Sequence, residues 1–140
     1  MGKIEQFEDI EAWQMGRELK NEIYRCSKRG EFAKDFALRD QIRRAALSVT
    51  ANIAEGVERG GNREFIQFLS HAKGSCGEVR DHLYTASDEE YLSQVEFQAL
   101  IQSAKRISGA ISAFIKYLQT TEIRGQKFRR FEPETLNLKP

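Results

Sequence analysis

Proline is almost absent from this chain. Both of its prolines, Pro133 and Pro140, lie at the C-terminal end, so residues 1–132 contain nothing that removes a backbone hydrogen-bond donor from a helix or kinks it in this way. Long uninterrupted helices are therefore permitted over most of the sequence. The length of 140 residues is that of one ordinary domain.

The composition excludes two classes of protein. Hydrophobic residues make up 40% of the chain and charged residues 31%, which is too apolar for a disordered polyelectrolyte and too charged for a membrane protein. Because apolar runs are short, we expect no membrane-spanning helix, no signal peptide and a cytoplasmic location. The 22 basic and 21 acidic residues leave a net charge of +1, so any electrostatic recognition has to come from a local patch.

Apolar and small residues recur at spacings of three and four in four segments. This pattern is typical of one buried stripe along a helix, and it predicts helices at about 9–28, 35–58, 62–88 and 94–119. The residues expected in the four stripes are Ala12, Gly16, Leu19, Ile23 and Cys26; Leu38, Ile42, Ala45, Val49, Ile53 and Gly56; Phe65, Phe68, Ala72, Cys76, Val79, Leu83 and Ala86; and Leu100, Ala104, Ile107, Ile111, Phe114 and Leu118.

Polar residues mark the beginnings of three of these helices. Asp9 and Asn62 are expected to cap the first and third helices, because short polar side chains accept hydrogen bonds from the free backbone donors there. Ser93 and Glu96 have the spacing of a capping box, in which each side chain satisfies a backbone donor of the other residue. The fourth helix is therefore expected to begin directly after Ser93.

Glycines mark the ends of the first two helices, at Gly30 and at Gly60-Gly61. Long helices joined by such short loops pack as antiparallel neighbours. No segment alternates apolar and polar residues at period two beside a turn pair, so no sheet is expected. The sequence predicts an all-α fold, an up-down antiparallel four-helix bundle over residues 1–119, with residues 120–140 as a tail outside it.

The two cysteines, Cys26 and Cys76, fall on apolar stripes and have no CxxC partner. This is typical of buried thiols in a reducing compartment, and not of a metal site or a disulfide. Glycine inside a helix costs about 1 kcal/mol relative to alanine, so we interpret the interior glycines as sites of close helix packing. They are Gly16, Gly74, Gly77 and Gly109.

Two rows of polar residues run beside the apolar stripes. One interpretation is a metal or acid/base site, but di-metal bundles use Glu-x-x-His, whereas Glu78 and His82 are four residues apart. The other is that the rows hydrogen-bond to each other and set helix register or a subunit contact, since a buried unpaired polar atom costs about 1–3 kcal/mol. The rows are Gln41, Arg44, Ser48, Asn52 and Glu55 in the second helix, and His71, Ser75, Glu78 and His82 in the third.

Motifs for catalysis and cofactor binding are missing from the sequence. Ser48 and Ser75 lie in no nucleophile elbow, and no GxGxxG or Walker sequence is present. We therefore expect no catalytic residue, no cofactor and no metal.

Basic residues cluster at several places along the chain. Each cluster is consistent with a solvated helix face or with charge that complements a helix dipole. In the C-terminal segment, Phe128 and Phe131 interleave with two arginines, a composition suited to stacking on bases or docking in a groove. The candidate nucleic-acid-binding residues are Arg39, Arg43, Arg59, Arg63, Arg129 and Arg130.

The segment Gln41–Gly56, QIRRAALSVTANIAEG, closely resembles the signature of a known family. This is the bacterial four-helix-bundle family named after the intervening-sequence protein of 23S rRNA genes, also called S23-like. The resemblance covers roughly residues 7–119. Further matches are Phe7 with Trp13, Arg63-Glu64-Phe65 after the glycine turn, Gly74-Ser75 with Glu78, and Tyr91-Leu92.

The resemblance implies a four-helix bundle assembled as a homopentamer with a central channel. The family is also similar to the accessory variability protein of diversity-generating retroelements, a basic pentamer that binds nucleic acid and a reverse transcriptase, whereas this chain has a net charge of only +1. With the polar rows, the resemblance implies structural or interface roles for Gln41, Arg43, Arg44, Ser48, Asn52, Glu55, Gly56, Ser75 and Glu78.

Three hypotheses about function follow. The leading one is a non-enzymatic oligomeric scaffold or adaptor that binds RNA or DNA weakly, in a salt-sensitive manner, through arginine clusters repeated around the ring. The alternative is a module that engages a partner protein through its channel or C-terminal tail, with Phe128 and Phe131 as anchors and no nucleic-acid binding. The third is an enzyme with metal bound to His71, Glu78 and His82.

Overall fold

The computed structural model describes residues 4–128, and side chains from Ile4 to Thr121. Its elements are the short 3-10 helix η1 (Phe7–Asp9) and the α-helices α1 (Glu11–Ser27), α2 (Gly30–Lys34), α3 (Phe36–Arg59), α4 (Asn62–Asp88) and α5 (Gln94–Phe128). Residues 4–128 contain no strand, which confirms the all-α class.

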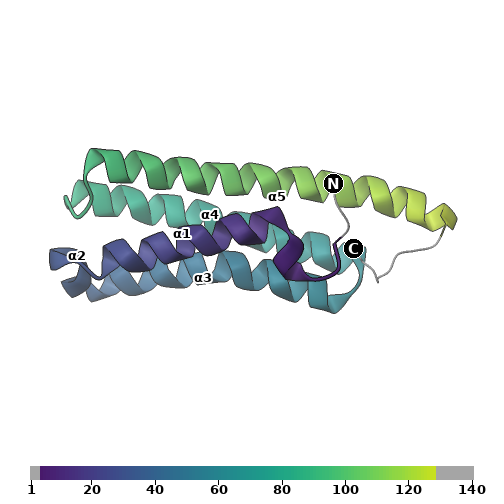
Figure 1. Cartoon of the computed structure of the whole chain (residues 1–140), viewed down its shortest axis with the longest axis horizontal. Helices are drawn as coiled ribbons and strands as arrows, with labels where there is room; N and C mark the ends of the chain where they lie inside the picture. The colour runs from purple at the N-terminus through teal and green to yellow at the C-terminus, as the bar shows by residue number, and fades with distance from the viewer. Residues whose placement is uncertain (1–3, 129–140) are drawn as a thin grey trace.

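The four long helices α1, α3, α4 and α5 lie side by side, and consecutive long helices run in opposite directions (Figure 1). The packed pairs among them are α3 with α4, α4 with α5, α1 with α3, and α1 with α5. Each long helix therefore packs mainly on two neighbours. The surface has four seams between adjacent helices, and the α3/α4 seam lies on the opposite side from the α1/α5 seam.

The core lies where the apolar stripes of the long helices meet. All of the expected stripe residues of α1, α3 and α5 are buried. In α4 the expectation is wrong at one position, because Phe68 is half-buried and Leu69 is fully buried instead. Phe68 lies toward α3, where the guanidinium of Arg59 sits 5.0 Å from the centre of its ring.

The structure corrects the expected N-terminal caps of α1 and α4. Asp9 ends η1 and does not cap α1; its Oδ2 accepts hydrogen bonds from the backbone N–H groups of Glu5 and Gln6, at 3.0 and 3.2 Å. Asn62 is the first residue of α4, after a cap at Gly61. Asn62 instead donates from Nδ2 to the carbonyl of Leu118 in α5, at 3.4 Å.

Other helix ends follow the local sequence signals. The backbone N–H of Ser93 donates to Glu96 Oε1 at 3.0 Å, and that of Glu96 to Ser93 Oγ at 3.1 Å, so the capping box is confirmed. Gly60 ends α3 in the left-handed conformation, with φ of 86°. Gly30 does not end α1, which stops at Ser27; with φ of 47° it begins α2.

The short helix α2 closes one end of the core with an aromatic side chain. Phe32 is buried and stacks on Tyr91, with ring centres 5.1 Å apart. The hydroxyl of Tyr91 donates to Asp35 Oδ2 at 2.9 Å, and Asp35 Oδ1 accepts from the backbone N–H of Leu38 at 3.1 Å. Asp35 therefore caps α3 and ties it to the loop before α5.

Helix α5 is longer than the sequence pattern predicts, because it continues to Phe128 and not to residue 119. It projects past the ends of the neighbouring helices (Figure 1). The physical reason is the absence of proline before Pro133, which lets helical hydrogen bonding continue after the apolar stripe stops. Arg129, Arg130 and Phe131 lie outside the described residues.

The interior glycines fall into two groups. A Cβ at Gly16 would meet Thr50 Cγ2 at 3.1 Å, so this glycine does allow close approach of α1 to α3. At the other three a Cβ would meet nothing within 4 Å, and the expectation of close packing is wrong for them within the described chain. These are Gly74, Gly77 and Gly109.

Candidate functional site

The polar rows of α3 and α4 meet in the seam between these two closely packed helices. The hydroxyl of Ser75 donates to the hydroxyl of Ser48 at 2.9 Å. Asn52 Nδ2 donates to the same hydroxyl at 2.9 Å and to the backbone carbonyl of Ser48 at 2.8 Å. Ser75 is 8% exposed, so this network satisfies polar groups that would otherwise be buried without partners.

The histidines of the α4 row are not gathered into a metal site. His82 Nε2 lies 3.8 Å from Glu78 Oε2 and makes no hydrogen bond, while Nδ1 lies 3.6 Å from Asp81 Oδ2. His71 packs edge-on against the ring of Phe68. Over residues 4–121, no group of three or more His, Cys, Asp or Glu side chains has a geometry that could hold a metal ion.

The rest of the α3 row is distributed over the rim of the seam. Gln41 and Arg44 are exposed, and Glu55 pairs with Arg59. Gly56 is buried, and a Cβ there would meet Phe65 Cδ1 at 2.8 Å and Phe68 Cβ at 3.0 Å. This glycine therefore sets how closely α3 approaches the start of α4.

Arg39 and Arg43, at the start of α3, are held by contacts within the chain. Arg39 Nη1 donates to the carbonyl of Ala33 at 3.1 Å, and its Nε pairs with Asp40 at 2.9 Å. Arg43 Nε donates to Ser27 Oγ at 2.8 Å. The Arg39 guanidinium also lies 4.7 Å from the centre of the Phe36 ring, and the Arg43 guanidinium lies 4.8 Å from the centre of the Tyr24 ring. A nucleic-acid phosphate would have to compete with these partners.

The second pair of candidate arginines lies at the other end of α3. Arg59 pairs with Glu55 at 2.8 Å and lies 3.8 Å from Glu64. Arg63 is exposed and forms no hydrogen bond or ion pair within the described residues. Arg39 and Arg59 are about 30 Å apart along the helix. The structure therefore does not bring the four arginines into one patch.

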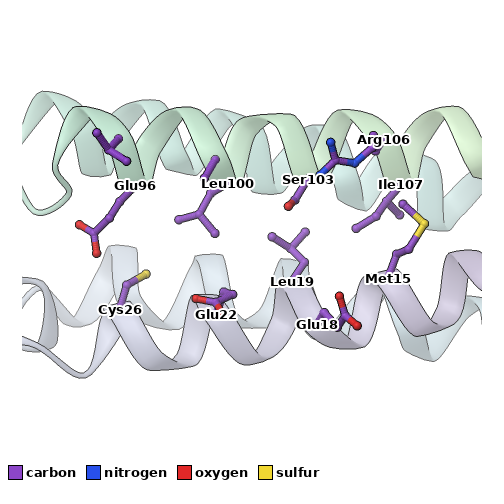
Figure 2. A pocket seen from close by; sticks show the side chains of 12 residues that line it. Met15, Glu18, Leu19, Glu22, Cys26, Glu96, Leu100, Ser103, Arg106 and Ile107 are labelled. Atoms are coloured by element: carbon purple, nitrogen blue, oxygen red, sulfur yellow. The ribbon is translucent and has the colours of Figure 1, made fainter.

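A groove of about 570 Å³ separates α1 from α5. Figure 2 shows Leu19 and Leu100 pointing toward each other across it. Glu18 and Arg106 stand among the lining side chains, and neither makes a hydrogen bond or ion pair within the described residues. Sequence reasoning missed this groove; one signal was Val95, an apolar residue at the first turn of α5 that is 81% exposed.

The two cysteines are free and buried. Burial raises the pKa of the Cys26 thiol, which lines the groove, and that of Cys76 to about 11 each. Nucleophilic cysteines have lowered pKa values. The expectation of structural thiols is therefore supported at both positions.

The chain is similar to known proteins in sequence and in fold. The model of the family described as 23S rRNA-intervening sequence protein matches residues 8–113. A solved structure of a protein with unknown function from the S23 ribosomal protein family of Bacteroides thetaiotaomicron has a similar fold, with a TM-score of 0.68 and 22% sequence identity, over 75% of this chain and 98% of that chain. No curated protein matches. Within the described residues, no helix is both long and apolar enough to span a bilayer.

Proposed function

Since this chain belongs to the family of 23S rRNA-intervening sequence proteins, we propose that it is a non-enzymatic cytoplasmic scaffold, a four-helix bundle over residues 1–119 that assembles as a homopentamer. The internal bonding of the Ser48–Ser75 network supports a structural role for the polar rows. The raised pKa values of both thiols also argue against nucleophilic chemistry.

The observation that carries the proposal is the complementarity of two separate surfaces, the outer side of α3 and the groove between α1 and α5. The outer side of α3 exposes Arg44 and Leu47, the latter 42% exposed. The groove between α1 and α5 has apolar side chains such as Leu19 and Leu100, and Glu18 is among its charged lining residues. Contacts between two different faces of one chain are heterologous, and they close into a ring when the rotation per subunit allows it. In the proposed ring, Leu47 enters the groove of the next copy and Arg44 approaches its Glu18.

A charge-exchange experiment tests this contact. Arg44→Glu and Glu18→Arg each place like charges across the interface, and both single variants should lower the mass measured by light scattering. The double variant restores opposite charges and should regain a mass near five subunits. Arg63→Glu, which changes an exposed arginine at another place, is the matched control and should leave the mass unchanged.

Two results would contradict the proposal in different ways. A monomeric wild-type protein at micromolar concentration would overturn the pentamer itself. A wild-type pentamer whose mass resists both single substitutions would overturn only the assignment of the two faces. Circular dichroism of each variant checks that the helices are retained.

The proposed scaffold also binds RNA or DNA through basic side chains that a ring repeats five times. Repetition supports this part, because several weak contacts on one polyanion act together. Binding is expected to weaken steeply between 50 and 200 mM salt as phosphate counterions are released. The test is fluorescence anisotropy with labelled oligonucleotides at both salt concentrations; salt-insensitive or absent binding would refute it.

A second candidate function is capture of a partner protein, and the projection of α5 favours it. The helix continues to Phe128, beyond its neighbouring helices (Figure 1), where it can offer a helical surface to a partner. A chain ending at Thr121 should then lose a crosslinked partner while it keeps its helicity and its oligomer mass. If the truncated chain still forms the crosslink, this function does not reside in the C-terminal segment.

A further inference from the structure

The seam between α4 and α5 carries basic residues on both of its sides. Two ring contacts set the register of these antiparallel helices: Phe65 against Phe114 and Tyr84 against Phe97, with centres 5.3 and 5.1 Å apart. By this register, position 73 of α4 and position 105 of α5 lie within about one helical turn of each other along the seam.

Helix geometry places four basic side chains on the outer side of this seam. Ser75 bonds toward α3, so Lys73 and Arg80, which lie on the other flank of the buried stripe and seven residues apart, face the α5 side. The α5 residues Lys105 and Lys116 are three turns apart on the flank away from α1. We call these four residues the α4/α5 basic face.

The charge of this face is not neutralised within the chain. Helix α4 has no acidic residue between Phe65 and Gly77, and α5 has none between Phe97 and Thr121. None of the four basic side chains forms a hydrogen bond or ion pair in the described residues. Arg80 Nε is buried without a partner. Glu78 and Asp81 are the carboxylates nearest to Arg80 in sequence, and they lie 3.8 and 3.6 Å from the ring nitrogens of His82.

The surface between these cations is open to a flat ligand. Gly77 and Gly109 are exposed, and a Cβ at either would meet nothing within 4 Å. Tyr84, one turn beyond Arg80, is 54% exposed. Only its edge-on contact with Phe97 is used inside the fold, so a face of the ring remains for stacking.

We propose that the α4/α5 basic face binds single-stranded nucleic acid, with the four cations on phosphates of the strand and a base stacked on Tyr84. This combination of a positive track and an aromatic platform is how proteins hold single strands without reading sequence. The inference rests on the nucleic-acid part of the proposed function and changes its location. Arg39, Arg43 and Arg59 are occupied by partners of their own, whereas this face is free.

The two proposed subunit contacts leave this face accessible. They use the outer side of α3 and the α1/α5 groove, and neither includes the α4/α5 basic face. A pentamer would therefore present five copies of the basic face, one for each subunit.

The test uses the full-length wild-type protein and labelled single-stranded RNA and DNA of about 16 nucleotides, the upper end of common site sizes. Four phosphate contacts predict that affinity falls about 50-fold between 50 and 200 mM salt. In the Lys73→Gln/Lys105→Gln variant two contacts remain, and the fall should shrink to about sevenfold. The control Lys20→Gln/Lys28→Gln removes the same charge from the α1 region and should keep the wild-type salt dependence.

The stacking contact has its own pair of variants. Tyr84→Ala should weaken single-strand binding about tenfold, while Tyr84→Phe, which keeps the ring, should bind as the wild type does. A duplex of the same length should bind more weakly than the single strand. Equal binding of duplex and single strand would overturn the role of Tyr84.

The outcomes separate this inference from the proposed function. If the wild type binds neither RNA nor DNA at 50 mM salt, both fail. If it binds and the Lys73→Gln/Lys105→Gln variant is unchanged while Arg39→Gln/Arg43→Gln loses binding, only the assignment to the α4/α5 basic face fails. If the protein prefers RNA or DNA, that preference identifies the kind of strand that the face binds. The weaker salt dependence of the Lys73→Gln/Lys105→Gln variant then still supports the assignment to the α4/α5 basic face.

Discussion

The hydroxyl of Ser75 in α4 donates a hydrogen bond to the hydroxyl of Ser48 in α3 at 2.9 Å. Ser48 also accepts a hydrogen bond from Asn52, one turn later in α3. The Ser48 hydroxyl therefore connects α3 to α4 and also bonds within α3. The seam is mostly closed to water here, since Ser75 is 8% exposed. A bond in such a place contributes to stability and fixes the register of α3 against α4.

Ser75→Ala should lower the free energy of unfolding by about 1 kcal/mol, the net value of one hydrogen bond. Ser48→Ala should cost more, because it removes the hydroxyl partner of both Ser75 and Asn52. Urea denaturation measures both. Ser70→Ala, at an exposed position of α4, is the control for helix propensity and should lie within about 0.5 kcal/mol of the wild type. Additive effects in the Ser48→Ala/Ser75→Ala double variant would show that the pair does not interact.

The second prediction compares two glycines of neighbouring helices. Gly56→Ala should destabilise the protein by about 1–3 kcal/mol, because its Cβ would come within 2.8 Å of the Phe65 ring. Gly74→Ala should stabilise it by about 0.5–1 kcal/mol, since no atom lies within 4 Å of the new Cβ. Thermal unfolding of both variants measures the difference, and the same sign for the two would contradict the packing described at Gly56.

The sequence pattern predicts the buried stripes well because burial follows helical periodicity. The one wrong position, Phe68, lies at the edge of a stripe, where a small rotation of the helix decides which of two adjacent residues faces the core. The ends of α1 and α4 were harder to predict. Asp9 and Asn62 have suitable cap chemistry, but their side chains bond to other backbone groups that the fold brings near.

The candidate arginines show why local sequence is a poor guide to a binding surface. Arg43 is bonded to Ser27, 16 residues earlier in the chain; only the folded chain reveals such a partner. Conversely, Lys73 has no basic neighbour in sequence and Lys105 has only Arg106, and packing of α4 on α5 places the two lysines on one face. The signal in the sequence was the long stretch of α5 without an acidic residue. A search for clusters of basic residues does not detect such a stretch.

The third prediction concerns the reactivity of the thiols. With pKa values of about 11, only about one thiol in a thousand is ionised at pH 8, and the thiolate is the reactive form. Native protein should therefore react slowly with a thiol reagent. Cys26, which is 6% exposed and lines the groove, should react faster than Cys76, which is 0% exposed.

Single Cys26→Ser and Cys76→Ser variants assign the two rates. If a second copy covers the groove as proposed, Arg44→Glu should also speed the reaction of Cys26 and leave that of Cys76 unchanged. Equal rates for the two thiols in the wild-type protein would contradict the position of Cys26 at the groove.

The last prediction is the pH dependence contributed by Glu96, whose carboxylate joins the start of α5 to Arg29 at the start of α2. The backbone N–H of Ser93 is the largest cause that holds the pKa of Glu96 below its ordinary 4.5; burial opposes this shift, and Arg29, 2.7 Å away, adds to it. A carboxyl with a lowered pKa in the folded protein stabilises the fold above its unfolded value and loses that contribution as pH falls through the folded value. Wild type should therefore exceed Glu96→Gln in stability at pH 7 by at most about 1 kcal/mol, since the pair is partly solvent-screened. This difference in stability should disappear as the pH falls below about 4.5, as measured by urea unfolding.

Salt separates the two causes. In 1 M salt the contribution from Arg29 is screened, whereas the bond from Ser93 remains. If the stability difference between wild type and Glu96→Gln vanishes in salt at pH 7, the stabilisation comes from Arg29, which would contradict the leading role of Ser93.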